Sequence, residues 1–195
     1  MNLILKGTVQ MTIIYFVRHA HATYTPDEMG RPLSEQGLRS ADMMTELLAK
    51  EEIDLVIASP YKRAIQTVEG LAKRIGRDVR IYPDFRERLL TVEPVENFEK
   101  AIFKVWTNPS FSFSGGESNI EAQKRGVEAT LEVLAQYEEE RIVIGTHGNL
   151  MVLIMQYFDK RFDFSFWQQL AMPEIYKIEF KRNNLKSVER LWIES

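Results

Sequence analysis

The sequence predicts an α/β protein in which a mostly parallel sheet lies between two layers of helices, with a hairpin at one edge. Three observations predict this fold: short continuous apolar runs, helical patterns between them, and a last pair of strand-like segments around a turn. Continuous apolar runs are typical of parallel strands, because helices cover both faces of a parallel sheet. Strands that alternate with helices form right-handed βαβ units. We therefore expect a three-layer α/β/α sandwich.

Four apolar runs have the length and the composition of buried strands. They are rich in β-branched and aromatic residues, which favour strands over helices in short runs. We expect them to pair side by side at the centre of the sheet. The expected strands are Ile13–Val17, Asp54–Ala58, Val79–Tyr82 and Arg141–Gly145.

Helical patterns fill the segments between these strands, with apolar residues spaced to form one helix face. Ser34 is a suitable N-cap for the first helix, and Pro60 stands where the second begins. Gly76 stops the second helix, because glycine tolerates the left-handed conformation that follows many helices. The last expected helix is apolar nearly all round, which predicts that it is buried. The expected helices span residues 34–50, 60–76, 118–137 and 149–158.

The C-terminal segment predicts a hairpin at the edge of the sheet. Glu174–Phe180 and Leu185–Ile193 have the pattern of two strands, and Asn183-Asn184 between them is a turn signal. An edge strand can also pair with a second subunit. The sequence therefore leaves a dimer open.

The length of 195 residues predicts one domain over residues 1–195. Residues 92–116 contain a short helix and a loop that ends in Ser114-Gly115-Gly116, and we interpret them as an insertion over the active site. Three interpretations of residues 1–10 stay open: an upstream start, a leader remnant or an edge strand.

The composition excludes several classes of function. The chain has no cysteine, which excludes thiolate metal sites, iron–sulfur clusters and cysteine nucleophiles. Its formal net charge is −3, so no overall basic charge indicates nucleic acid or an acidic membrane as a partner. No apolar run approaches the roughly 20 residues that span a bilayer. These features favour a cytoplasmic protein without nucleic acid or membrane partners.

Polar residues follow three of the expected strands, where the carboxyl ends of parallel strands meet. Ligands of open α/β sheets bind at this end of the sheet, so we expect these residues to converge on one rim. The third strand is followed at once by a helix, whose first N–H groups and dipole favour an anion. The converging residues are Arg18, His19, Arg63 and His147, with Gly148 at the start of that helix.

Two arginines and a helix N-terminus fit a phosphate group. A guanidinium matches phosphate oxygens with a planar pair of N–H groups, and a neutral imidazole can attack phosphorus as a nucleophile. Hydrolysis also needs an acid that protonates the leaving alcohol. Glu87, just after the expected strand Val79–Tyr82, is placed to supply it. A solvated ion-pair cluster with Arg86 and Arg88 is the alternative for Glu87.

These residues lie in five motifs that resemble those of the histidine phosphatase superfamily, the phosphoglycerate-mutase-like group. The motifs occur in the family's order, and the resemblance covers about Thr12 to Ile193. The motifs are Val17-Arg18-His19-Ala20, Ser59-Pro60-Tyr61-Lys62-Arg63-Ala64, Arg86-Glu87-Arg88, Gly115-Gly116-Glu117-Ser118 and Thr146-His147-Gly148-Asn149.

The resemblance implies a role for each residue of the site. His19 becomes phosphorylated, and Glu87 donates a proton to the leaving group. Neither a metal ion nor an organic cofactor is expected, and the partner is a small phosphorylated substrate. Glu117 and Ser118 lie near the pocket in the family pattern. The residues that hold the phosphoryl oxygens are Arg18, Arg63 and His147.

The chain departs from the family after the nucleophile. The common form there is Gly, then Glu or Gln, then Thr or Ser, whereas this chain has Ala20, His21 and Ala22. Ala22 lacks a hydroxyl that often helps to bind phosphate, so Thr23 is the candidate replacement and His21 a candidate further pocket group. Candidate specificity residues are His21, Tyr24, Glu28, Arg31, Lys62 and residues 92–113.

Aromatic residues are unusually dense in two segments. Core packing explains most of them, and the remainder could line an apolar mouth over the pocket, which would suit a hydrophobic or aromatic leaving group. The sequence leaves the division open. The residues are Phe111, Phe113, Phe162, Phe164, Phe166 and Trp167.

Three functions fit the resemblance. A phosphatase releases the phosphoryl group to water, a phosphoglycerate-type mutase returns it to another hydroxyl, and a non-catalytic member only binds a phosphorylated ligand. A mutase usually needs a larger lid than the short stretch between Glu87 and Glu117. A pure binder usually loses a catalytic residue, and this chain keeps all five. We therefore predict a phosphatase.

Overall fold

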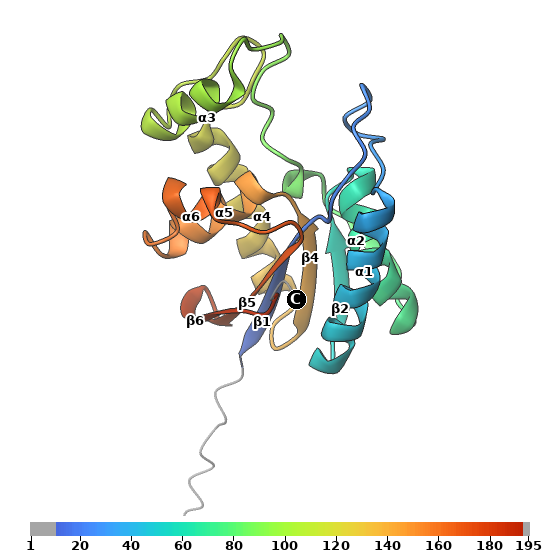
Figure 1. The fold of residues 1–195 in the computed structure, drawn as a ribbon. Helices are drawn as coiled ribbons and strands as arrows, with labels where there is room; N and C mark the ends of the chain where they lie inside the picture. The colour runs from blue at the N-terminus through green and yellow to red at the C-terminus, as the bar shows by residue number, and fades with distance from the viewer. Residues whose placement is uncertain (1–10, 193–195) are drawn as a thin grey trace, which may run out of the picture.

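The computed structural model describes residues 11–192. The predictions for residues 1–10 and for Ile193 lie outside this range. Six strands form one sheet in the order β3-β2-β4-β1-β5-β6 (Figure 1). The pairs β1–β4, β2–β4 and β2–β3 are parallel, and β1–β5 and β5–β6 are antiparallel. The strands are β1 (Thr12–Arg18), β2 (Leu55–Ala58), β3 (Val79–Ile81), β4 (Arg141–Thr146), β5 (Glu174–Lys181) and β6 (Asn184–Arg190).

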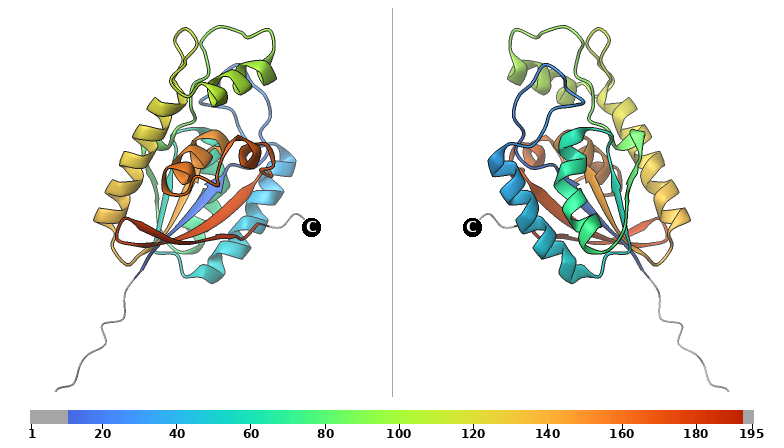
Figure 2. Two further views of the ribbon diagram at one scale, coloured as in Figure 1. Left: turned by 90° about the vertical axis from the view of Figure 1, so that its left-hand side faces the viewer. Right: turned by 90° about the vertical axis from the view of Figure 1, so that its right-hand side faces the viewer.

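Helices cover both faces of this sheet. One side view in Figure 2 shows α5 and α6 in front of the sheet, and the opposite view shows α1 and α2 in front of it. The predicted α/β/α sandwich with an edge hairpin is confirmed. The helices are α1 (Glu35–Leu48), α2 (Lys62–Arg74), α3 (Phe98–Thr107), α4 (Asn119–Gln136), α5 (Gly148–Phe158) and α6 (Phe164–Gln168).

Side chains at alternate positions of β1 divide the core into two layers. Ile14 and Phe16 are buried toward α4 and α5, whereas Tyr15 and Val17 are buried toward α1 and α2. All four are fully buried. A strand that is apolar on both faces must lie between two helix layers, which explains why the continuous run identified β1.

Local signals fix most of the helix ends. The hydroxyl of Ser34 accepts the backbone N–H of Gly37 at 3.1 Å and caps α1. Ser118 and Glu121 form a capping box at the start of α4. Gly76 has a φ of +67° just after α2, as its predicted role at the end of that helix requires.

The differences from the prediction include the start of one helix, the position of the hairpin turn and one additional helix. Helix α2 begins at Lys62, because Pro60 and Tyr61 form a bend before it. The hairpin turns at Arg182-Asn183, one position before the expected pair, and Arg182 takes the left-handed φ of 54°. The sequence analysis also did not predict α6, a helix of five residues that Asp163 caps.

Helix α3 lies within residues 92–116, beyond the end of the sheet where β1 and β4 end (Figures 1 and 2). The described strands form one sheet, and the helices lie on its faces or beyond its end. That residues 1–195 form a single domain stays a prediction. Strand β6 forms one edge of the sheet, and dimerisation through it also stays a prediction. None of the helices within residues 11–192 has the length and apolar character needed to cross a membrane.

Candidate active site

His19 follows β1 directly and is 9% exposed. Its Nδ1 lies 2.8 Å from the carbonyl oxygen of Ala20. A carbonyl oxygen can only accept, so Nδ1 carries the proton and Nε2 keeps its lone pair. The Nε–H of Arg63 donates to this Nε2 at 3.1 Å. The strand end therefore presents a neutral imidazole with its unprotonated nitrogen against an arginine.

The surroundings keep the His19 imidazole neutral. Burial, together with the charges of Arg63, Arg18 and Arg31, lowers the pKa of His19 to about 3, against the bond to the Ala20 carbonyl, which raises it. Protonation would place a cation among three other cations away from water. At neutral pH the Nε2 lone pair is therefore available for a bond to phosphorus.

His147 follows β4 and is fully buried beside His19, with the two ring centroids 5.2 Å apart. Its Nε2 lies 2.8 Å from the hydroxyl oxygen of Ser59, which follows β2. Its Nδ1 has no partner among the described residues. Burial lowers the pKa of His147 well below its usual value, and His19 and Arg63 add to the effect. Three strand ends thus meet at one point, as the topology predicted.

Arg63 enters the site from the first turn of α2 and is 4% exposed. Besides His19, its guanidinium bonds the carbonyl oxygen and the carboxylate of Glu28, each at 2.8 Å. The same carboxylate also pairs with Arg31. A guanidinium that holds a carboxylate in this manner also fits the oxygens of a phosphate.

Arg18 is the last residue of β1, and its Nη1 donates to the carbonyl oxygens of Leu170 and Ala171 at 3.0 and 2.9 Å. Its Nε is buried and has no hydrogen-bond partner within residues 11–192. Burial lowers the pKa of Arg18, against the charges of Glu87 and Glu174. Gly148 makes room for it, since a Cβ there would lie 2.9 Å from the Arg18 Nε. Arg18 thus has N–H groups left for an anion at the start of α5.

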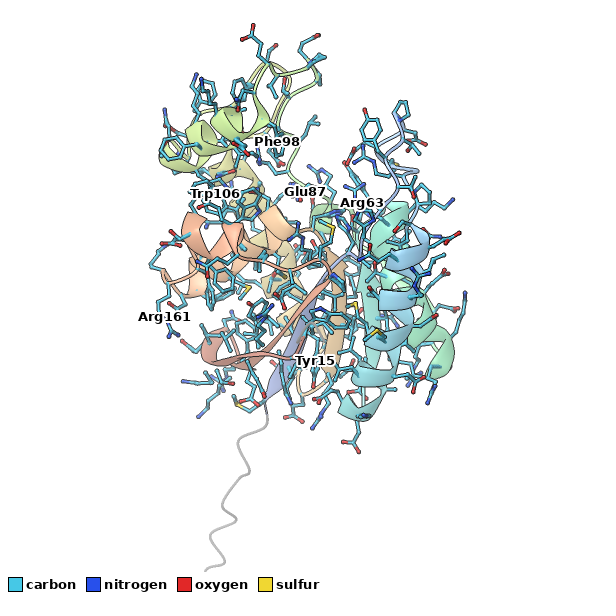
Figure 3. All side chains as sticks on the ribbon, in the orientation of Figure 1. Tyr15, Arg63, Glu87, Phe98, Trp106 and Arg161 are labelled. Carbon is cyan, nitrogen blue, oxygen red and sulfur yellow. The ribbon has the colours of Figure 1, made fainter. Side chains whose placement is uncertain are left out.

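Glu87 is tied to that same helix start. Its Oε1 accepts the backbone N–H of Leu150 at 3.2 Å and that of Arg88 at 2.8 Å. The ion pairs of this segment belong to Arg86, which pairs with Asp84 at 3.0 Å. Figure 3 shows Glu87 at the same end of the sheet as Arg63. Hence a carboxyl group lies at the end of the sheet that carries the histidines, close enough to Arg18 for its charge to raise the pKa of that guanidinium.

Comparison with known proteins shows which family the chain belongs to. The family model of the histidine phosphatase superfamily (branch 1) matches residues 14–192. The chain belongs to the histidine phosphatase superfamily. The predicted resemblance is confirmed, and with it the prediction of a phosphohydrolase of this superfamily.

Individual members of the superfamily are more distant. A metal-independent phosphoserine phosphatase of Arabidopsis thaliana is 28% identical over 75% of this chain and 68% of its own. A phosphoglycerate mutase-like protein of the same plant is 26% identical over 71% of this chain and 67% of its own. A mycobacterial glucosyl-3-phosphoglycerate phosphatase has the same fold, with a TM-score of 0.77 at 20% identity over 95% of this chain and all of that one.

The two other residues that the sequence predicts to bind the substrate, His21 and Thr23, contact the protein itself. His21 is exposed, and its Nδ1 lies 2.8 Å from the hydroxyl oxygen of Ser34. Thr23 is exposed and bonds the carbonyl of Pro32 through its backbone. The structure therefore brings Arg18, His19, Arg63, Glu87, His147 and Gly148 together, while His21 and Thr23 belong to the loop before α1, and their binding roles stay predictions.

Glu117 and Ser118 support the site from the start of α4. The carboxylate of Glu117 binds Arg125 at 2.6 and 2.7 Å, and Ser118 caps the helix. Arg125 also donates to the carbonyl oxygens of Asp84 and Arg86, at 2.6 and 3.0 Å. Arg125 therefore holds the segment that carries Glu87. Sequence reasoning missed it, because an arginine on a charged helix carries no signal that its side chain is mostly buried.

The sequence did not predict that two further polar residues near the site are buried. Arg88 and Asn149 are each 5% exposed. The Nε and Nη1 atoms of Arg88 and both amide atoms of Asn149 have no partner among the described residues. Both lay within the quoted motifs, yet nothing in the sequence distinguished them from surface residues. Within residues 11–192, no three His, Asp or Glu side chains gather as metal ligands would.

Proposed function

We propose that the chain hydrolyses phosphate monoesters through a phosphohistidine on Nε2 of His19, without a metal ion. The observation that carries this proposal is the neutral His19, whose Nε2 lone pair meets Arg63 in a buried site shared with Arg18 and His147. The names of the relatives, which include phosphoserine and glucosyl-3-phosphoglycerate phosphatases, support a small phosphorylated substrate.

In the first step, Nε2 of His19 forms a bond to phosphorus while the bond from phosphorus to the alcohol oxygen breaks. The phosphoryl group enters between Nε2 and the Arg63 N–H group that bonds it in the free protein. Glu87 gives its proton to the leaving oxygen. Two backbone N–H groups hold its Oε1, so Oε2 is the oxygen that carries the proton.

Fixed donors stabilise the phosphoryl group during its transfer, since most of the catalysis of phosphoryl transfer is electrostatic. Arg18 and Arg63 supply positive charge, and His147 and the first N–H groups of α5, with Gly148 at their head, complete the set. His21 and Thr23 would contact the outer part of the substrate from the loop before α1.

In the second step, water attacks the phosphohistidine. The carboxylate of Glu87 takes a proton from this water, the N–P bond breaks, and its electron pair returns to Nε2 of His19. Phosphate leaves, and Glu87 is again protonated. A mutase shares the first step and differs in the second, where a hydroxyl of the substrate replaces water.

The test is phosphate release from p-nitrophenyl phosphate in EDTA by wild type and His19→Ala. We expect turnover in wild type and a loss of about 10⁴-fold or more in the variant. Acid-labile, alkali-stable label on the wild-type protein after rapid quenching would identify the phosphohistidine. Turnover by His19→Ala would refute the proposal, and conversion of 3-phosphoglycerate to its isomer without phosphate release would indicate a mutase.

A further inference from the structure

A cleft of about 740 Å³ opens beside the candidate active site. This volume lies within the usual range of small-molecule sites, roughly 300–1,000 Å³. Arg18 lines the cleft and also belongs to the phosphate site, so the two are continuous. Besides Arg18, the polar residues that line the cleft are Glu99, Lys100 and Gln168. The apolar walls come from α3 and from α6 with the residues after it, and consist of Phe98, Ile102, Phe103, Phe164, Trp167 and Leu170.

Aromatic contacts join the two walls. Phe164 and Trp167 of α6 stack at 5.7 Å, and the ring of Phe103 from α3 meets Phe164 edge-on at 6.0 Å. Trp106, which Figure 3 labels on α3, packs against Phe164 at 5.7 Å. Offset and edge-on aromatic pairs stabilise such an arrangement. The rings of Phe103, Phe164 and Trp167 are therefore held in place before any ligand enters.

Two phenylalanines of the cleft remain in contact with solvent. Phe98 is 59% exposed and Phe103 is 56% exposed. Single exposed apolar residues are common on protein surfaces, whereas contiguous ones around a cavity mark a binding site. Here the two residues adjoin a cleft that reaches a catalytic arginine. Covering these rings with an apolar group would remove their surface from water.

The position of Arg18 decides which part of a substrate enters the cleft. Arg18 stands next to His19 in the chain, and both line the region where the phosphoryl group binds. Attack by His19 Nε2 requires the leaving oxygen on the far side of the phosphorus, roughly in line. The alcohol part of the ester therefore extends away from His19, and the cleft that begins at Arg18 is the adjoining space.

We infer that the substrate is a phosphate monoester of an aromatic or otherwise flat, apolar alcohol, which fills the cleft between α3 and α6. This inference rests on the proposed function and adds the class of leaving group. A serine leaving group would bring an ammonium and a carboxylate against six apolar side chains. Charges that leave water must be paired, and the polar residues of the lining that would have to pair them are Arg18, Glu99, Lys100 and Gln168, so O-phosphoserine serves as the competing substrate in the test.

The test compares 3-phenylpropyl phosphate with propyl phosphate, because the two alcohols are almost equally poor leaving groups and differ mainly in the ring. We expect wild type to have a kcat/KM about 50-fold higher for the phenylpropyl ester, the gain from burying one ring. O-phosphoserine should be no better than propyl phosphate. In Phe98→Ala and in Phe103→Ala, the ratio of the two kcat/KM values should fall about fivefold, because the phenylpropyl ester loses more contact with the cleft than the propyl ester.

Tyr157→Ala is the matched control. Tyr157 is an aromatic residue of α5 that is 51% exposed and does not line the cleft, so its loss should leave the ratio as in wild type. Equal kcat/KM values for the two esters in wild type, or a preference for phosphoserine, would overturn the inference while p-nitrophenyl phosphate is still hydrolysed. Equal losses for both esters in the variants would also overturn it. No hydrolysis of any of these esters would instead refute the proposed function.

Discussion

The floor of the site, made of Arg18, His19, Arg63 and His147, differs from its roof, the aromatic walls of α3 and α6. The floor residues come from strand ends and a first helix turn, and hydrogen bonds orient their side chains. The roof depends on ring packing, and two of its phenylalanines are more than half exposed. Phosphoryl transfer needs charges fixed in position, whereas recognition of an alcohol needs apolar surface, and the chain builds the two from separate segments.

The largest effect on the floor, apart from loss of the nucleophile, is expected for Gly148→Ala. The new methyl group would stand 2.9 Å from the Nε and 3.1 Å from the Cζ of Arg18. The flexible arginine can move, so the protein folds, but the guanidinium leaves its place. We expect kcat/KM to fall about 100-fold, the typical loss from a displacement of 1 Å in a site.

Gly70→Ala on α2 is the control for this glycine, because its new Cβ would meet the Thr45 Oγ1 at a similarly short 2.8 Å, but away from the residues of the floor. It should leave kcat/KM unchanged, and both variants should unfold at temperatures close to that of wild type. An active Gly148→Ala would show that Arg18 does not need its present position.

A smaller effect is expected for Arg125→Lys, which affects the connection between floor and roof. Lysine keeps the charge toward Glu117 but loses the fork that also holds the carbonyl oxygens of Asp84 and Arg86. Glu87 then loses its fixed position, and kcat should fall about tenfold, part of what a general acid supplies. The measurement compares alkyl and p-nitrophenyl esters.

If Arg125 acts through Glu87, the loss should be greater for the alkyl ester, whose leaving group needs the proton. Glu87→Gln should show the same pattern more strongly. Equal losses for both esters in Arg125→Lys would assign Arg125 a purely structural role.

The smallest expected effect concerns pH: the protonation of the two histidines of the floor should not change between pH 7.5 and pH 5. His19 has a pKa of about 3, and that of His147 is well below its usual value. Their ring signals in NMR, assigned with His19→Asn and His147→Asn, should stay constant from pH 7.5 to pH 5. A His19 signal that titrates near pH 6.5 would contradict the buried, neutral ring.

The lowered pKa values of His19 and His147 also affect the free energy of unfolding. The unfolded chain binds a proton at each of these histidines near pH 6.5, and the folded chain does not. The unfolded state therefore binds more protons below pH 6.5, so the free energy of unfolding falls as pH drops from 6.5 toward 3. Denaturant titrations of wild type and His19→Asn measure this contribution.

The floor could be predicted from the sequence because its position follows from topology. Arg18, His19 and His147 stand at the ends of strands that the apolar runs identified, and parallel strands end on the same side of a sheet. The bond between Arg63 and Glu28 could not be predicted, because a loop of irregular structure determines it.

The roof could not be predicted in the same way. The aromatic residues of α6 have no helical period that five residues could reveal, and the cleft needs them to meet α3, some sixty positions earlier in the chain. The sequence analysis left open whether these rings belong to the core or to an apolar mouth. The structure divides them: Phe162 is buried in the core, while Phe164 and Trp167 line the cleft.

The two hydrogen bonds from Arg18 to the carbonyls of Leu170 and Ala171 have a consequence for the binding of two ligands at once. Leu170 lines the cleft, so under the proposed function the side chain of Arg18 contacts both the anion and the segment that receives the alcohol. Thermodynamic linkage is reciprocal. An alcohol that shifts Leu170 would change the affinity for phosphate, and phosphate would change the affinity for that alcohol by the same factor, so we expect that the two products of one turnover do not dissociate independently.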